Sequence, residues 1–222
     1  MKTKKVVIIG NTSNARLAKY FFSYDSDYEP VAFSAHAKYI ESDEYEGLPL
    51  VPFETLHDKY PPDQFEAFVA VGYTKMNKIR EMLYNECKSM GYTMANYISS
   101  RCSYISQFQP GDNCFILEDN TIQPYVKIGN NVVLWSGNHI GHDVEISDHC
   151  FITSHVVVSG FVKIGHNSFL GVNATIRDGI TIAPQTLVAA GAIIMKDTEE
   201  KGVYLPARSM KFEKNSDELK IS

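Results

Sequence analysis

The chain has 222 residues, of which 44 % are hydrophobic and 21 % are charged. These proportions are typical of a globular protein and exclude a disordered or fibrous chain. The formal net charge of −5 provides no basic stripe for nucleic acid, although a phosphate-bearing small molecule can still bind locally. No apolar run approaches the roughly 18 residues that cross a bilayer, and residues 6–9 read as a strand rather than a signal peptide. The four cysteines include no Cys-x-x-Cys pair, so we expect reduced thiols in a cytoplasmic protein.

Residues 1–98 alternate between strand-like and helix-like patterns. The predicted strands are residues 6–9, 30–33 and 67–71, and the predicted helices are residues 14–24, 53–60 and 75–90. This alternation predicts a small α/β domain with a Rossmann-like parallel sheet. Arg80, on the third predicted helix, is expected on its solvated face, although it could reach a phosphate.

Ligands of such sheets bind at the carboxyl ends of the strands. One such end is formed by Gly10, Asn11, Thr12, Ser13 and Asn14, which lie between the first strand and the first helix, and Gly72 follows the third strand. Backbone N–H groups at a helix N-terminus can bind phosphate there. The absence of a G-x-G-x-x-G pattern disfavours NAD, and the structural alternative is a helix N-cap at Thr12 or Ser13. We predict that these six residues bind the nucleotide part of a substrate.

The second half of the chain has a period of six. Every sixth residue from Ile116 to Val188 is Ile, Leu or Val, and the position four residues later is usually small or β-branched. A helix repeats its faces about every 3.6 residues and a strand every two, so a period of six suits neither as a lone element. A period of six is expected of a chain that turns a corner every six residues. Such a chain points one aliphatic side chain inward on each of three faces. The pattern therefore predicts a parallel β-helix of stacked eighteen-residue coils.

This repeat, the preceding α/β half and the segment NHIGHDV (residues 138–144) together resemble a family of bacterial sugar acyltransferases. The family includes the sialic acid O-acetyltransferases and the nucleotide-amino-sugar N-acetyltransferases. Residues 158–165, 169–174, 189–192 and 206–208 follow its pattern too, so the resemblance covers residues 5–211. It implies a left-handed β-helix and a homotrimer with active sites between subunits. Residues 1–98 would bind the sugar nucleotide, residues 99–211 would form the acyltransferase β-helix, and residues 212–222 a polar tail.

The resemblance also implies the site residues. It assigns a general base to His142 and an acidic partner to Asp143, and it places acetyl-CoA against the main chain of Val172 and Ala190. A histidine that contacts acetyl-CoA in the family is replaced here by Phe151. Asn14 likewise stands where family members have a histidine, and Ser34-Ala35-His36 stands where they often carry acidic residues.

The chemistry suits these residue types. A neutral imidazole, with an ordinary pKa of about 6.5, can accept the proton of a sugar amine or hydroxyl that attacks the thioester. An adjacent carboxylate fixes the tautomer, and backbone N–H groups can stabilise the oxyanion. Spacing alone favours a solvated His142, and the family resemblance reverses that preference. His155 is the main competing base.

Several histidines in this region also raise the possibility of a metal site. They are His139, His142, His149, His155 and His166. Successive hexapeptides fall on different faces of a β-helix, so neighbours in sequence need not converge in space, and no cysteine has ligand spacing. We therefore predict no metal.

The predicted function is acetyl transfer from acetyl-CoA to the amino group of a nucleotide-linked amino sugar used in surface polysaccharide or glycan synthesis. Three alternatives remain at this point. The acceptor could be a hydroxyl, as in sialic acid O-acetylation, or the donor a longer acyl group such as hydroxybutyryl. The third alternative is a trimeric scaffold that binds sugar nucleotides without catalysis.

Overall fold

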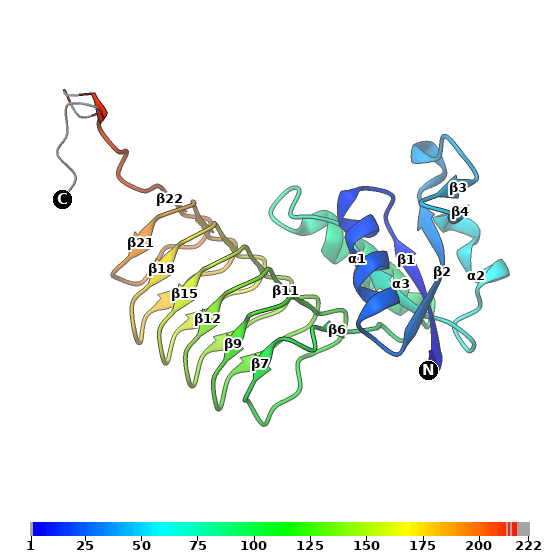
Figure 1. The fold of residues 1–222 in the computed structure, drawn as a ribbon, viewed down its shortest axis with the longest axis horizontal. Helices are drawn as coiled ribbons and strands as arrows, with labels where there is room; N and C mark the ends of the chain where they lie inside the picture. Colours follow the sequence, from blue (N-terminus) through cyan, green and yellow to red (C-terminus); the bar gives the residue numbers. More distant parts are fainter. Residues whose placement is uncertain (1, 212, 214, 217–222) are drawn as a thin grey trace.

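The computed structural model describes residues 2–211, 213, 215 and 216. An α/β domain and a β-helix lie side by side, and the chain leaves the last coil in an extended segment (Figure 1). Of the predicted polar tail 212–222, residues 212, 214 and 217–222 lie outside the described residues.

The α/β domain has a five-stranded sheet in the order β3-β4-β2-β1-β5. Its strands are β1 (Lys4–Ile9), β2 (Tyr28–Ala35), β3 (Glu44–Tyr45), β4 (Leu48–Pro52) and β5 (Glu66–Val69). All neighbours pair in parallel except β3 and β4, which are antiparallel. The three predicted strands are confirmed within two residues. β3 and β4 were not predicted, because β3 has only two residues and prolines interrupt the β-pattern of β4.

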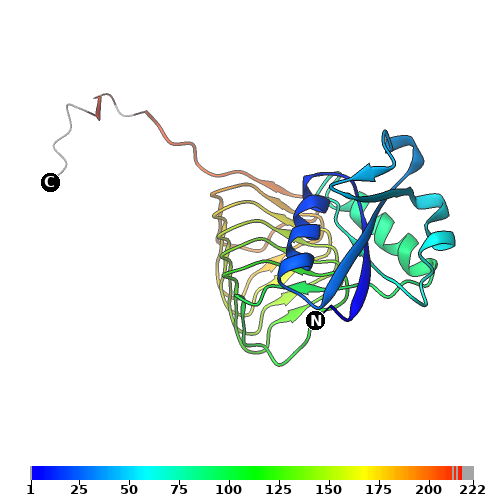
Figure 2. The ribbon, with the colours of Figure 1, turned by 45° about the vertical axis from the view of Figure 1, so that its right-hand side comes forward.

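Helices cover both faces of this sheet. They are α1 (Ser13–Tyr24), α2 (Leu56–Lys59) and α3 (Lys78–Ser89), with short 3₁₀ turns at Ala37–Tyr39 and Phe53–Thr55. α1 packs on the side of the sheet next to the β-helix (Figure 2), and α2 and α3 pack on the other side. α3 begins three residues later than predicted, because Lys75, Met76 and Asn77 have φ angles of 53°, 53° and 64°. These left-handed angles cannot continue into an α-helix.

The β-helix is left-handed and has three parallel sheets of two-residue strands. The docked face contains β6 (Tyr97–Ile98), β8 (Phe115–Ile116), β11 (Val133–Leu134), β14 (Phe151–Ile152), β17 (Phe169–Leu170), β20 (Leu187–Val188) and β22 (Val203–Tyr204). The open face contains β7 (Ser103–Tyr104), β9 (Thr121–Ile122), β12 (His139–Ile140), β15 (Val157–Val158), β18 (Thr175–Ile176) and β21 (Ile193–Ile194). The charged face contains β10 (Lys127–Ile128), β13 (Glu145–Ile146), β16 (Lys163–Ile164) and β19 (Thr181–Ile182). Since β6 pairs with β8, the β-helix begins two residues before the predicted boundary at 99.

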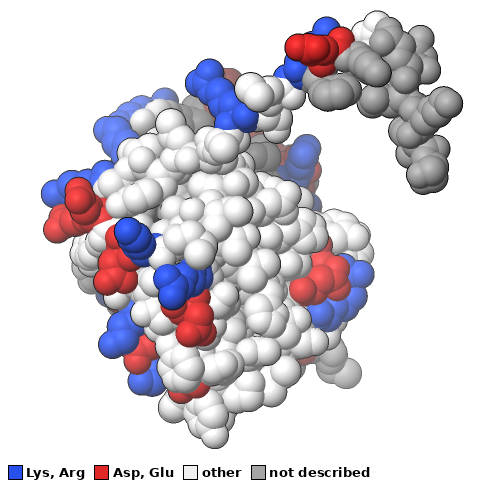
Figure 3. Space-filling view, turned by 90° about the vertical axis from the view of Figure 1, so that its left-hand side faces the viewer, with Lys and Arg blue, Asp and Glu red and all other residues white. Residues whose placement is uncertain are grey.

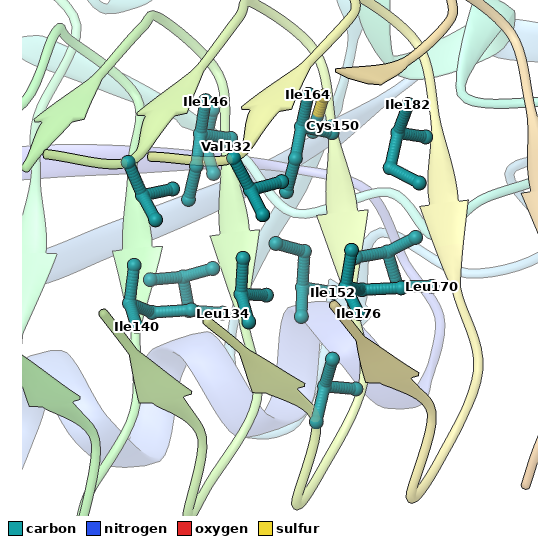
Figure 4. Close-up of a cluster of buried hydrophobic side chains, with 14 of the residues drawn as sticks. Val132, Leu134, Ile140, Ile146, Cys150, Ile152, Ile164, Leu170, Ile176 and Ile182 are labelled. Atoms are coloured by element: carbon teal, nitrogen blue, oxygen red, sulfur yellow. The ribbon is translucent and has the colours of Figure 1, made fainter. Parts of the chain in front are cut away.

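The predicted aliphatic column is confirmed. Every sixth residue from Ile116 to Val188 is buried, and Ile128 is the most exposed of them at 6 %. The side chains stack along the axis from coil to coil (Figure 4). Asn120 and Asn138 occupy two inward positions where neighbouring coils mostly have small or β-branched side chains. Asn138 Nδ2 donates to Asn120 Oδ1 at 2.9 Å. The buried polar pair is therefore satisfied and does not break the column.

A second period of six sets the corners. Every sixth residue from Asn113 to Gly191 has a positive φ, which turns the chain from one face to the next. Asn, Asp and Gly occupy most of these positions, because they tolerate the left-handed region best. Tyr125 and Phe161 are bulky exceptions on either side of Asp143 in the same corner column.

The α/β domain packs on the docked face. The outward side chains of Phe115, Val133 and Phe151 belong to the same buried cluster as α1. Arg80 is also buried here, so the prediction of a solvated side chain is wrong. Its Nη2 donates to the backbone oxygens of His149 at 2.8 Å and Cys150 at 3.2 Å, and burial lowers the pKa of Arg80 to about 10.

Candidate active site

A cleft lies at the carboxyl ends of β1, β2 and β5. Five of the six residues predicted to bind nucleotide line this cleft, namely Gly10, Asn11, Thr12, Asn14 and Gly72. Ser13 is not among the lining residues. The cleft encloses about 1730 Å³, part of it open to solvent. The sequence therefore located this cleft from its strand ends alone.

The cleft suits an anion. Thr12 is the N-cap of α1, but its side chain makes no capping hydrogen bond, so the first-turn N–H groups keep their capacity to bind a ligand. Lys38 and Lys75 line the same cleft, and none of the described lining residues is acidic. At Gly10, φ is 133°, and an added Cβ would lie 3.2 Å from the oxygen of Ala70, so this tight turn requires glycine.

Two asparagines of the cleft contact other residues that line it. Asn11 Nδ2 donates to the oxygen of Tyr39 at 2.9 Å and holds the turn after β2. Asn14 Nδ2 lies 2.9 Å from the position that a Cβ of Gly72 would occupy, so Gly72 leaves room for this amide. His36 also lines the cleft, and its Nδ1 lies 3.0 Å from Glu54 Oε1.

His142 and Asp143 form a contact pair on the corner between the open and charged faces. His142 Nδ1 lies 3.0 Å from Asp143 Oδ2, and the backbone N–H of His142 donates to Gln123 Oε1 at 2.9 Å. The Phe161 ring meets the imidazole edge-on, with centroids 4.9 Å apart at 89°. The side chains of His142 and Asp143 are 49 % and 40 % exposed. With Nδ1–H donated to the carboxylate, Nε2 presents a lone pair to the outside.

Gly160 makes room for this imidazole. It follows His142 by one coil, and an added Cβ would lie 2.9 Å from both Cε1 and Nε2 of the ring. Sequence reasoning missed Gly160 and Phe161. The eighteen-residue coil length could have found both, since it places them directly beside His142 and Asp143.

Val172 and Ala190 lie on a different corner, between the docked and open faces. They are exposed and stack one coil apart, with the oxygen of Val172 accepting from the N–H of Gly191 at 2.8 Å. His155, the competing base, lies on this second corner, with its ring against Gly137. The structure thus separates His142 from Val172, Ala190 and His155 within one chain.

The cleft is also remote from His142 within one chain. Each coil runs from the docked face to the open face and then to the charged face. The corner between the open and charged faces therefore lies across the coil from the docked face, where the α/β domain sits. His142 and the cleft therefore lie on different sides of the same chain.

The other histidines do not converge either. In the part of the chain that the structure describes, no three His, Cys, Asp or Glu side chains gather in a metal-binding arrangement. All four cysteines are free. No helix among the described residues combines the length and apolarity that a bilayer crossing requires.

Sequence models of two hexapeptide repeats match the β-helix. The bacterial transferase hexapeptide (six repeats) matches residues 125–160, and the hexapeptide repeat of succinyl-transferase matches residues 161–196. These matches cover the coils that hold His142, Phe161 and Val172.

Solved structures resemble this hexapeptide-repeat protein over most of its length. The acetyltransferase domain of PglB from Neisseria gonorrhoeae FA1090 has a TM-score of 0.80 at 19 % identity, covering 92 % of this chain and 100 % of that chain. Perosamine N-acetyltransferase, PerB, from Caulobacter crescentus has 0.76 at 22 %, covering 90 % and 92 %. WeeI from Acinetobacter baumannii AYE has 0.76 at 16 %, covering 90 % and 96 %. The likeness shows that the fold is shared across both parts of the chain.

Proposed function

We propose that this protein transfers an acetyl group from acetyl-CoA to the amino group of a nucleotide-linked amino sugar. The observation that carries the proposal is the exposed His142–Asp143 pair, in which Nδ1 faces the carboxylate and Nε2 is left to accept a proton. The anion-suited cleft supports a nucleotide diphosphate as the handle of the acceptor. The structural neighbours support the choice, since the PglB domain was solved with acetyl coenzyme A and PerB with CoA and GDP-perosamine.

The proposed reaction is a direct transfer. The amine nitrogen attacks the thioester carbonyl, a C–N bond forms, and His142 Nε2 accepts the proton that the nitrogen loses. Asp143 stabilises the resulting imidazolium through Nδ1–H. The tetrahedral intermediate then breaks its C–S bond, and the CoA thiolate leaves with the proton from His142. The proposed donor for the oxyanion is the backbone N–H of Gly160, one coil from His142, which donates no hydrogen bond among the described residues.

We further propose that the active site is shared between copies in a homotrimer. The cleft and His142 lie on opposite sides of the coil, so the cleft of one copy has to meet His142 of another. The open face is suited to this contact, because its outward side chains carry no Lys, Arg, Asp or Glu and include the exposed Val157 and Ile193. The charged face instead carries Lys127, Glu145 and Lys163.

The molecular surface agrees with this arrangement. The side of the molecule formed by the β-helix presents a broad area without Lys, Arg, Asp or Glu side chains (Figure 3). Acetyl-CoA would then lie along the β-helix near Val172 and Ala190, which face outward one coil apart. If this corner of one copy packs against the His142 corner of a neighbouring copy, the proposed acetyl-CoA contacts and the proposed base lie in one active site.

The test is a CoA-release assay with acetyl-CoA and a panel of amino-sugar nucleotides, for wild type and His142→Ala. We expect release with at least one acceptor and a loss of about 10²- to 10⁴-fold in the variant. His155→Ala is the matched control and should keep wild-type activity. Full activity in His142→Ala, or no release with any acceptor in wild type, would contradict the proposal. A monomer in light scattering would contradict the shared site.

A further inference from the structure

An unpaired carboxylate lies beside the proposed base. Asp178 Oδ1 lies 3.2 Å from the position that a Cβ of Gly160 would occupy, and His142 Nε2 lies 2.9 Å from the same position. The two side chains come from the coils on either side of Gly160. Gly160 itself is buried, and its missing side chain leaves this space to the imidazole and the carboxylate. The two atoms therefore lie within about 6 Å of each other, a separation that one amino group bound outside the corner can bridge.

Asp178 has no partner of its own. Among the described residues it makes neither a hydrogen bond nor an ion pair, and its neighbour Arg177 donates to the oxygen of Met195 at 3.3 Å. The carboxylate thus contributes an uncompensated negative charge next to His142. Nothing in the fold requires that charge, since the side chain is exposed on a corner of the β-helix.

Phe161 lies beside His142 on the same corner. Its ring lies edge-on to His142, and the residue is 54 % exposed although φ is 59°. The positive φ belongs to the corner, as at every sixth residue of the β-helix, and it directs the ring toward His142 on the neighbouring coil. An exposed aromatic ring offers an apolar surface to the carbon face of a small ring, such as a deoxy sugar.

We propose that Gly160, Phe161 and Asp178 form the acceptor subsite beside His142, and that Asp178 makes this subsite selective for an amino group over a hydroxyl. The inference rests on the proposed function and names its acceptor class. A primary amine arrives largely protonated near neutral pH, and the Asp178 carboxylate attracts the ammonium group. A hydroxyl at the same place carries no charge and gains no comparable attraction. The ammonium group releases one proton to solvent before the neutral amine attacks.

The proposed role of Asp178 predicts a specific pattern of kinetic constants in variants of this residue. The carboxylate binds the ammonium form, which is not the nucleophile, so its contribution appears in binding of the acceptor rather than in the chemical step. Asp178→Asn should raise KM for the amino sugar about tenfold, in line with the loss of one charge-assisted hydrogen bond, and leave kcat and KM for acetyl-CoA within about twofold. The wild-type KM should rise with salt, and the variant should lose that dependence.

The experiment measures both binding and turnover on the full chain. UDP-, GDP- and dTDP-linked 4-amino-4,6-dideoxyhexoses and their 4-hydroxyl counterparts are titrated by calorimetry and assayed for CoA release. Asp178→Glu should recover most of the affinity for the amine. Asp119→Asn, which removes an exposed carboxylate from another corner, should change nothing. Phe161→Leu should weaken both the amino and the hydroxyl ligand with the oligomeric state unchanged.

The outcomes separate this inference from the proposed function. Equal affinity of wild type and Asp178→Asn for the amino sugar overturns the inference, whether or not CoA is released. Loss of amine affinity in Asp178→Asn supports it even if wild type releases no CoA, a result that would refute the transfer reaction alone. Absence of binding by any ligand overturns both. A change of oligomeric state in Phe161→Leu would reassign that ring to the subunit interface.

Discussion

Replacing Gly160 by alanine tests the geometry around His142 without touching the imidazole. The added methyl group would lie 2.9 Å from Cε1 and Nε2, closer than real Cβ contacts, so the ring has to move. The contacting atoms are the far end of an exposed side chain, so the movement costs little folding energy. It does pull Nδ1 away from Asp143, and a displacement of about 1 Å at a reacting group can cost about 10²-fold in rate.

We therefore expect Gly160→Ala to lower kcat about 100-fold and to change the free energy of unfolding by less than about 1 kcal/mol. Steady-state CoA release gives the first quantity, and urea unfolding gives the second. Gly179→Ala is the matched control on the same corner. An added Cβ there meets nothing within 4 Å, but φ is 68°, so this variant should lose about 1 kcal/mol of stability and keep its activity.

Two results would refute this reasoning. Wild-type activity in Gly160→Ala would mean that the position of the His142 ring does not govern the reaction. A large loss of stability would mean that the imidazole cannot move aside, contrary to its 49 % exposure. In the first case the base has to be sought elsewhere, with His155 next in line.

Two further predictions concern folding. Ile152→Ala removes a fully buried side chain from the aliphatic column and should destabilise the protein by about 3 kcal/mol in urea unfolding, whereas Thr181→Ala on the charged face should cost less than about 0.5 kcal/mol. Burial lowers the pKa of His149 below its ordinary 6.5, and protonation would also remove the acceptor for Asn131 Nδ2, 2.9 Å away. The unfolded chain then binds the proton more readily, so the stability contributed by neutral His149 is full above about pH 6.5 and is lost as the pH falls toward the folded-state pKa.

Each of these folding predictions has a clear counter-result. Equal urea midpoints for Ile152→Ala and wild type would place Ile152 outside a packed core. The pH dependence is measured as unfolding free energy between pH 5 and 8 in wild type and His149→Gln, a range that brackets the ordinary pKa. An unchanged slope in the variant would assign the dependence to other groups that face His149, such as Glu81, Asp148 and His166.

The β-helix was predictable because its rules are local. Each corner depends on one left-handed residue, and each inward position recurs after six residues, so both signals are present in a short window of sequence. The corner signal from Asn113 to Gly191 was equally available and was missed. The docking of the two parts was not predictable, since Arg80 finds its acceptor on His149, 69 residues away. A charged residue on a helix face gives no local sign of such a partner.

The prediction of His142 and Asp143 as base and acid came from the family resemblance, whereas the sequence pattern by itself determined the α/β domain, the coiled repeat and the position of the cleft. Those features follow from the side-chain period and from strand ends, which short-range chemistry sets. Only the tertiary structure decided on which face of the coils the α/β domain docks and which side chains of neighbouring coils contact one another. It set Gly160, Phe161 and Asp178 around His142, and it separated that corner from the cleft and from Val172 and Ala190. The physical reason is that coil stacking brings together residues eighteen positions apart, and docking on one face turns the remaining faces toward solvent or toward another copy.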